Sequence, residues 1–226
     1  SKKILGPASR VNKQKQYMRQ VIKTIRADNN SSRKFKRMGA ISRATPVVQE
    51  PLDKGSYPIR SWNAYVENPL DSNQNGYTPQ CRPTVLYTGT HDGLIHAFRV
   101  DGLAATNSKC AGIVPSQDED DIGRELWAVI PHTLLKGSHA LVDRFHFLMD
   151  GELHLKDVLL VRSDPTTADT LKEAKQWRSV LSGGYGKGGR GFFAFDVTNA
   201  LDGPEVLWEI DPERRCTSGG CFAGEI

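Results

Sequence analysis

The chain has 226 residues, of which 38% are hydrophobic and 25% are charged, as in an ordinary globular protein with a sizeable buried core. No apolar run approaches the roughly 20 residues that a membrane-spanning helix needs. The opening Ser-Lys-Lys has neither an initiator Met nor the apolar stretch of a signal peptide. We therefore expect no integral membrane span, and we expect the chain to be cut from a longer protein at both ends.

Charge is distributed unevenly along the chain. Residues 1–43 carry thirteen Lys or Arg and one acidic residue, a net charge of +12, whereas the remainder carries a net charge of −8. A basic arm can bind nucleic acid or an anionic surface, or it can be a solvated helix that rests on the acidic body. The arm has only Tyr17 and Phe35 as aromatic residues, too few for a base-stacking platform. We expect a solvated arm and no nucleic-acid partner.

The apolar pattern predicts one helix before the β-structure begins. Apolar residues recur every three or four positions within 14–26, which is typical of a short amphipathic helix. An extended strand is expected within 38–48, and the loop-forming composition of 50–83 predicts a long loop with little core. Residues 1–37 are therefore expected to be a basic helical lead-in, and residues 38–226 a β-domain.

Two groups of three β-prone runs stand about ninety residues apart in the sequence. In the first group Asp92-Gly93 separates the first two runs, and this dipeptide is typical of a tight hairpin turn. In the second group six glycines lie between the first two runs, from Gly183 to Gly191. The runs are 85–89, 94–100 and 125–130 in the first group, and 179–181, 192–197 and 206–210 in the second.

The two groups align with each other residue by residue. The middle run of each contains Ala-Phe, and Trp127 and Trp208 occupy the same place in the third run. Tandem antiparallel units are typical of β-propeller blades, and a propeller needs at least about four blades to close. We expect an all-β, incomplete β-propeller in which Trp127 and Trp208 anchor neighbouring blades. Blades are expected around 84–130 and 177–211, with further strands at 145–149 and 157–161 in the span 145–162.

One loop has the pattern of a calcium ligand set. Asp71, Asn73 and Asn75 alternate before Gly76, as in the first half of an EF-hand loop. The twelfth position is Arg82, where an EF-hand needs a bidentate Glu. The loop is therefore either a calcium site that takes carboxylates from elsewhere or a simple Asn-Gly turn.

The four cysteines have no zinc-type spacing. Their even number and loop-like surroundings allow two disulfides, Cys216 with Cys221 and Cys81 with Cys110, and thus an oxidising compartment. Four free thiols are the alternative.

The sequence resembles the C-terminal propeller domain of the PilC/PilY family, the type IV pilus tip-associated adhesins and biogenesis factors. The likeness covers roughly residues 20–210 and follows the family's order of motifs. It departs from the family at Ala27, where Gly is usual, and at Ala40, where Asp is usual. The segments that carry it are 21–26, 38–41, 45–48, 86–98, 123–131, 180–191 and 193–198.

The resemblance implies a non-enzymatic protein that passes through the periplasm to the outer membrane, pilus tip or cell surface. It implies that the protein binds or caps minor pilins, promotes pilus assembly and extension, and mediates surface adhesion for twitching motility. Family members carry a calcium loop in the propeller, whose usual position is expected beyond Ile226. The Asp71 loop is an independent calcium candidate.

Two enzymatic interpretations also have some support in the sequence. Residues 186–191 match G-x-G-x-x-G, but a strand is expected after them, whereas a dinucleotide site needs a helix there. A quinone-dependent dehydrogenase propeller has similar repeats, yet it typically has adjacent cysteines, which this chain lacks. A periplasmic or outer-membrane propeller scaffold without pilus function is a third alternative. We expect no catalytic and no cofactor-binding residues, and we expect His96 to be structural.

Overall fold

The computed structural model describes five stretches of the chain, residues 38–67, 78–100, 122–135, 145–161 and 170–210. It also describes the isolated positions Lys15, Gln16, Arg19, Ile22, Lys23, Cys110, 137–138 and Leu141. The five isolated positions between 15 and 23 are helical and exposed, within the predicted amphipathic helix. In the described part, no helix is long and apolar enough to cross a membrane.

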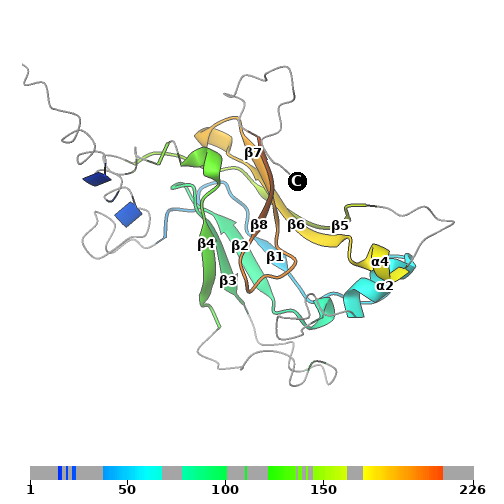
Figure 1. Cartoon of the computed structure of the whole chain (residues 1–226). Coiled ribbons are helices and arrows are strands. Elements are labelled where there is room, and N and C mark those ends of the chain that lie inside the picture. The colour runs from blue at the N-terminus through cyan, green and yellow to red at the C-terminus, as the bar shows by residue number, and fades with distance from the viewer. Residues whose placement is uncertain are drawn as a thin grey trace, which may run out of the picture.

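Two four-stranded antiparallel sheets form the body of the described chain (Figure 1). In each sheet the strands pair in chain order, so each sheet is an up-and-down meander with the form of a propeller blade. The first sheet contains β1 (Val47–Gln49), β2 (Val85–Gly89), β3 (Ile95–Arg99) and β4 (Glu125–Val129). The second contains β5 (Leu153–Leu159), β6 (Trp177–Gly184), β7 (Phe192–Asp196) and β8 (Glu205–Ile210). Short helical elements are α2 (Arg60–Glu67), α4 (Thr170–Ala174), η1 (Pro79–Cys81), η4 (His132–Leu134) and η5 (Gly186–Gly188).

The two sheets repeat each other in strand register. Ala97 lies opposite Trp127, and Ala194 lies opposite Trp208. In both sheets an irregularity in register follows immediately, between Ala97 and Phe98 and between Ala194 and Phe195. The repeat predicted from the sequence is thus confirmed down to single pairs of facing residues. Each unit also has a fourth strand, β1 or β5, which the alignment of three runs did not include.

The sheets pack face to face around one apolar core. Along β6 burial alternates from residue to residue, because successive side chains of a strand point to opposite faces. The inward side chains of the second sheet pack against those of the first. The fully buried members of this core include Val85, Tyr87 and Ile95 from the first sheet, and Leu181, Phe193 and Phe195 from the second.

Polar side chains also tie one sheet to the other. The buried Gln49 donates its amide to the carbonyl oxygen of Val197 (3.1 Å) and accepts the hydroxyl hydrogen of Tyr87 (2.6 Å). Trp127 donates its indole N–H to the carbonyl oxygen of Ala200 (2.7 Å). The bonds to Val197 and Ala200 cross the interface, so they fix the position of one sheet relative to the other in a way that apolar contacts alone do not.

The predicted strand at 145–149 is wrong. These residues form no regular strand. Leu148 donates its backbone N–H to the His91 carbonyl (2.7 Å), and Asp150 donates its backbone N–H to the Tyr185 carbonyl (3.1 Å). Because Leu148 and the nearby Asp150 donate to carbonyl groups next to two different sheets, the segment bridges the sheets instead of joining either one. The strand expected at 157–161 lies earlier, as β5.

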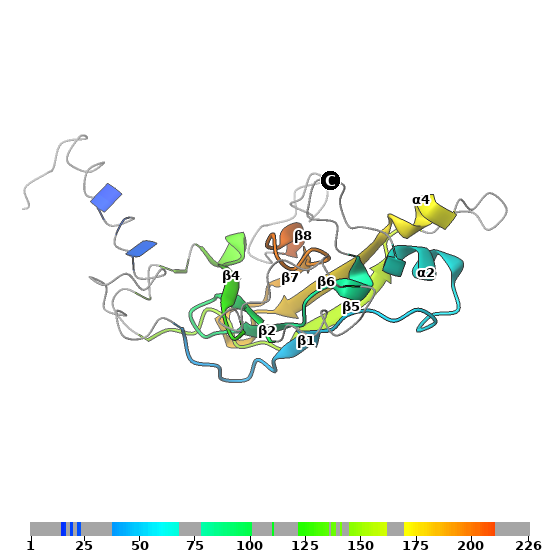
Figure 2. The same cartoon turned by 90° about the horizontal axis from the view of Figure 1, so that it is seen from below.

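The segment 50–83 contains a helix that the loop prediction missed. Helix α2 buries Trp62, Tyr65 and Val66 against Ala174 and Trp177. It lies beside α4 at one end of the second sheet (Figures 1 and 2). In the sequence, Tyr65 and Val66 follow Trp62 by three and four positions, the spacing of a helix face. The Pro, Gly and Asn residues around them favoured a loop prediction instead.

Replacing Gln49 with Leu is expected to destabilise the fold by about 1–3 kcal/mol, because the Tyr87 hydroxyl and the Val197 carbonyl would stay buried without this partner. The measurement is urea denaturation followed by fluorescence. The control is Val48→Ala on the neighbouring exposed position, for which a change within about 0.5 kcal/mol is expected. Equal effects of the two variants would contradict the role given to Gln49.

Candidate interaction surface

The glycine-rich loop between β6 and β7 lies directly on the segment that precedes β5. A Cβ atom at Gly188 would overlap the carbonyl oxygen of Leu148, and one at Gly151 would overlap the carbonyl oxygen of Gly184. The backbone N–H of Lys187 donates to Asp150 Oδ1 (2.6 Å). The glycines therefore permit backbone to pack on backbone, and β7 follows them as a strand, so they do not have the geometry of a phosphate-binding loop.

Three loops at this end bring aromatic and cationic side chains together. Phe145 stacks on His91 with ring centroids 4.3 Å apart, and Phe147 meets Phe145 edge to face at 5.1 Å. The Lys187 ammonium lies 5.0 Å from the centroid of the Phe147 ring. Phe145 is 63% exposed. We call His91, Phe145, Phe147 and Lys187 the aromatic–cationic surface.

Backbone hydrogen bonds hold this surface in place. His91 Nδ1 accepts the backbone N–H of Ala40 (2.8 Å), and the His91 carbonyl accepts the N–H of Leu148. Lys187 is held through its own backbone by Asp150. Exposed aromatic side chains are typical of the centres of protein–protein interfaces, and a lysine such as Lys187 is typical of their polar rim. The sequence showed these residues singly, but only the fold brings their three loops together.

Near this end, Glu209 of β8 clamps the connection between the sheets. Its carboxylate accepts the backbone N–H groups of His132 (2.9 Å) and Thr133 (2.8 Å) at the start of η4. Thr133 is also hydrogen-bonded to the hydroxyl of Tyr185, which lies beside the glycine-rich loop. The segment after β4 is thereby fixed to the second sheet.

An array of hydroxyl, imidazole and carboxylate groups lies in the first sheet, with Thr90 and His96 buried and Glu125 exposed. His96 Nδ1 is 2.6 Å from Glu125 Oε1, and His96 Nε2 is 3.3 Å from Thr90 Oγ1. The Thr90 hydroxyl is buried and also bonded to Asp92. Through these bonds His96 joins the β2–β3 turn to β4. This is the structural role expected for His96.

The opposite end of the sheets is held by a buried arginine. Arg82 donates from Nε to the Glu50 carbonyl (2.6 Å) and from Nη1 to Ser179 Oγ (2.7 Å). Asp157 lies 3.7 Å from the same guanidinium nitrogen. Tyr65 of α2 is buried nearby, and this burial raises the pKa of its phenol. The buried Arg82 thus links the first sheet to the second, and Asp157 lies close enough to balance its charge.

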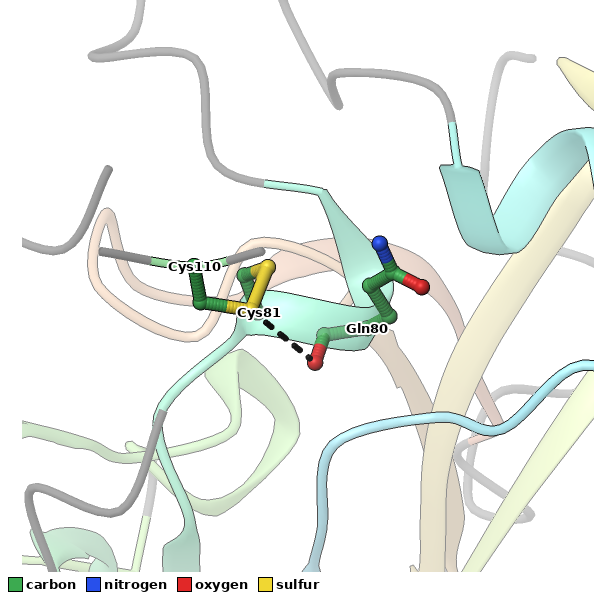
Figure 3. Close-up of a disulfide and its surroundings, with 3 residues drawn as sticks. All are labelled: Gln80, Cys81 and Cys110. Carbon is green, nitrogen blue, oxygen red and sulfur yellow. Dashed lines mark hydrogen bonds between the residues drawn. A yellow bond between two sulfur atoms is a disulfide. The ribbon is translucent and has the colours of Figure 1, made fainter. Parts of the chain in front are cut away.

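A disulfide between Cys81 and Cys110 lies next to Arg82. The disulfide lies at η1 (Figure 3), and the Cys110 sulfur is 3.9 Å from the carbonyl oxygen of Gln80. Both cysteines are buried. This is one of the two pairs allowed by the sequence, and it ties a residue distant in the chain to the short helix that precedes Arg82.

The remaining predicted site residues lie outside the described part of the chain. They are Asp71, Asn73 and Asn75 of the calcium loop, and Cys216 and Cys221. Among the described residues, no group of three or more His, Cys, Asp or Glu side chains is arranged to hold a metal ion. Calcium binding by the Asp71 loop stays a prediction.

Two meanders that repeat in register and pack face to face define successive blades of a β-propeller. The chain belongs to the family described as the PilY1 beta-propeller domain, whose family model matches residues 59–220. The resemblance read from the motifs is thereby confirmed.

Similar curated proteins include a Type IV pilus biogenesis factor PilY1 homolog of Xylella fastidiosa (strain Temecula1). It is 32% identical over 133 residues, which cover 57% of this chain and 7% of the relative. PilY1 of Pseudomonas aeruginosa (strain PAO1) is 27% identical over 162 residues, covering 70% of this chain and 12% of that protein. The chain therefore spans about a tenth of the length of these relatives.

A solved structure, the C-terminal domain of Pseudomonas aeruginosa PilY1, is also similar. It matches with a TM-score of 0.37 and 24% identity, over 63% of this chain and 21% of that one.

The substitution Gly188→Ala is expected to destabilise the protein by about 3 kcal/mol or more, because the added methyl group would meet the Leu148 backbone, which cannot move without breaking its bond to His91. The matched control is Gly184→Ala at the end of β6, just before the same loop, where the nearest atom is 3.2 Å away on the exposed Phe192 ring. Thermal unfolding of both variants gives the comparison. A Gly188→Ala protein with the melting temperature of the wild type would show that the loop does not pack as described.

Removing the disulfide with the double variant Cys81→Ala/Cys110→Ala is expected to cost about 3–4 kcal/mol, from the chain entropy of a loop with a sequence separation of 29. Denaturation midpoints with and without a reductant measure the effect. Peptide mapping of the unreduced protein should recover the Cys81–Cys110 linked pair, and its absence would contradict the pairing.

Proposed function

We propose that the chain is part of the propeller of a type IV pilus biogenesis factor that works at the pilus tip and cell surface, without catalysis. Membership of the PilY1 beta-propeller family carries this proposal. In it, the protein is exported through the periplasm, binds minor pilins, promotes pilus assembly and extension, and supports surface adhesion and twitching motility.

The aromatic–cationic surface is the part of the described chain that we assign to this contact. Phe145 offers exposed apolar area at low cost in conformational entropy, and Lys187 offers a cation held near an aromatic face. Such a surface fits a partner that presents apolar side chains beside carboxylates. The buried state of Thr90 and His96 supports a binding role over a hydrolytic one.

The test is complementation of a strain that lacks the gene. The full-length gene with Phe145→Ser and Lys187→Glu is expected to restore fewer surface pili and smaller twitching zones than the wild type. The lost aromatic contact weakens binding by about 1–2 kcal/mol, roughly 5–30-fold, and the reversed charge at Lys187 repels an acidic partner. The matched control is Leu160→Ser, an exposed apolar residue beyond the opposite end of β5. Immunoblots of the surface fraction check that export is equal.

The outcomes separate the function from the surface. Normal pili in the deletion strain would overturn the pilus function. If the deletion strain loses its pili, and the double variant and the Leu160 control restore pili and twitching equally, the pilus function stands and the assigned surface is wrong.

A further inference from the structure

His91, in the turn between β2 and β3, is bonded to two other segments of the chain. Its backbone N–H donates to the Ala40 carbonyl (3.0 Å), and its ring nitrogen Nδ1 accepts the Ala40 N–H (2.8 Å). Its carbonyl accepts the N–H of Leu148 (2.7 Å), and its ring stacks on Phe145. The residue therefore joins residues 38–46, which we call the pre-β1 segment, to the segment before β5.

The bond from Ala40 requires a neutral imidazole ring. In a neutral imidazole one nitrogen carries a hydrogen and the other accepts, whereas both nitrogens of an imidazolium ion are donors. Because His91 Nδ1 accepts the Ala40 N–H, its hydrogen must be on Nε2. Protonation of Nδ1 would place two N–H donors against each other, so this hydrogen bond exists only while the ring is uncharged.

The other contacts of His91 tolerate a charged ring. Phe145 lies almost parallel to it, at 16° and with ring centroids 4.3 Å apart, and a cation is attracted to the face of an aromatic ring. The two backbone bonds of His91, to Ala40 and Leu148, do not involve the ring. Protonation therefore removes one of the two bonds to Ala40 and leaves the β2–β3 turn in place.

Charged groups lie on each element packed against His91. Asp92 follows it on the same turn, with its buried carboxylate against Gly39, and favours the charged ring. Lys187 of the η5 loop lies over Phe147, whose ring meets that of His91 edge to face at 6.2 Å, and opposes the charge. The other ionisable residues of the pre-β1 segment and the segment before β5 are Arg43, His146, Asp150 and Glu152.

We propose that His91 is a pH-sensitive switch that holds or releases the pre-β1 segment. The neutral ring holds Ala40 on the β2–β3 turn, and protonation within about pH 5–8, where histidine ordinarily changes charge, releases its N–H. The contact is complete at the higher pH and is lost as the pH falls. Because the pre-β1 segment connects residues 1–37 to the first sheet, the switch sets how firmly this connection is held.

Hydrogen exchange of the Ala40 amide tests the switch. NMR of the 226-residue chain at about pH 7.5 and about pH 5 gives a protection factor, which removes the intrinsic pH dependence of exchange. Ala40 is exposed, so the released amide exchanges with water. Its protection factor is expected to fall about tenfold at the lower pH, the effect of losing one hydrogen bond. Equal protection at both pH values would overturn the proposal.

The variant His91→Asn separates this ring from other ionisable groups. The Asn side-chain oxygen can accept at the place of Nδ1 and does not titrate, so Ala40 should be protected equally at both pH values. The matched control is His154→Asn, at an exposed position of β5, which should keep the fall seen in the wild type. A fall in His91→Asn as large as in the wild type would show that another group is responsible.

The nitrogen chemical shifts of the His91 ring test the same switch in the unaltered protein. At about pH 7.5 the hydrogen is expected on Nε2 alone, and at about pH 5 on both nitrogens. A hydrogen on Nδ1 at the higher pH, or a ring that stays neutral at the lower pH, would overturn the proposal. Neither measurement involves a pilus partner, so the result is independent of the test of the proposed function.

Discussion

The structure depends on the face-to-face contact between its two sheets. Each meander alone exposes one apolar face, and a single sheet of four short strands has too little core to be stable. Packing Val85 and Ile95 against Leu181 and Phe193 gives both sheets a common core. Gln49 and Trp127 then fix the angle and register of that contact, because a buried donor must meet its acceptor at a definite position.

The same constraint shapes the surface at the glycine-rich end. The linker before β5 must leave the first sheet and start the second, so its backbone is bonded to both sheets through Leu148 and Asp150. Only glycines leave room for the facing loop to bond to it so closely. Because Asp150 before β5 and Lys187 of the loop are bonded to each other, the Lys187 ammonium lies over the Phe147 ring, an arrangement that suits a binding surface.

Much of the β-structure could be read from the sequence. Asp92-Gly93 between two apolar runs marks a hairpin, and the equivalent tryptophans mark a repeated unit, because both signals are local. The run at 145–149 has the same apolar character as a strand, but its hydrogen-bond partners lie in two sheets. Helix α2 was missed because its stability comes from packing on a residue distant in the chain. Trp177 donates a hydrogen bond to Ser61 of the helix, although 116 positions separate the two residues.

By itself, the sequence determined the repeated blade, the family and the possible cysteine pairs, since these follow from residue order and spacing. The tertiary structure decided which residues share a site. His91, Phe145 and Lys187 come together only because β2, β6 and the linker end at the same edge of the packed sheets. It also decided that Trp127 is engaged while Trp208 is exposed. The two residues occupy the same place in the repeat, and the physical difference between them is whether another sheet packs on that face.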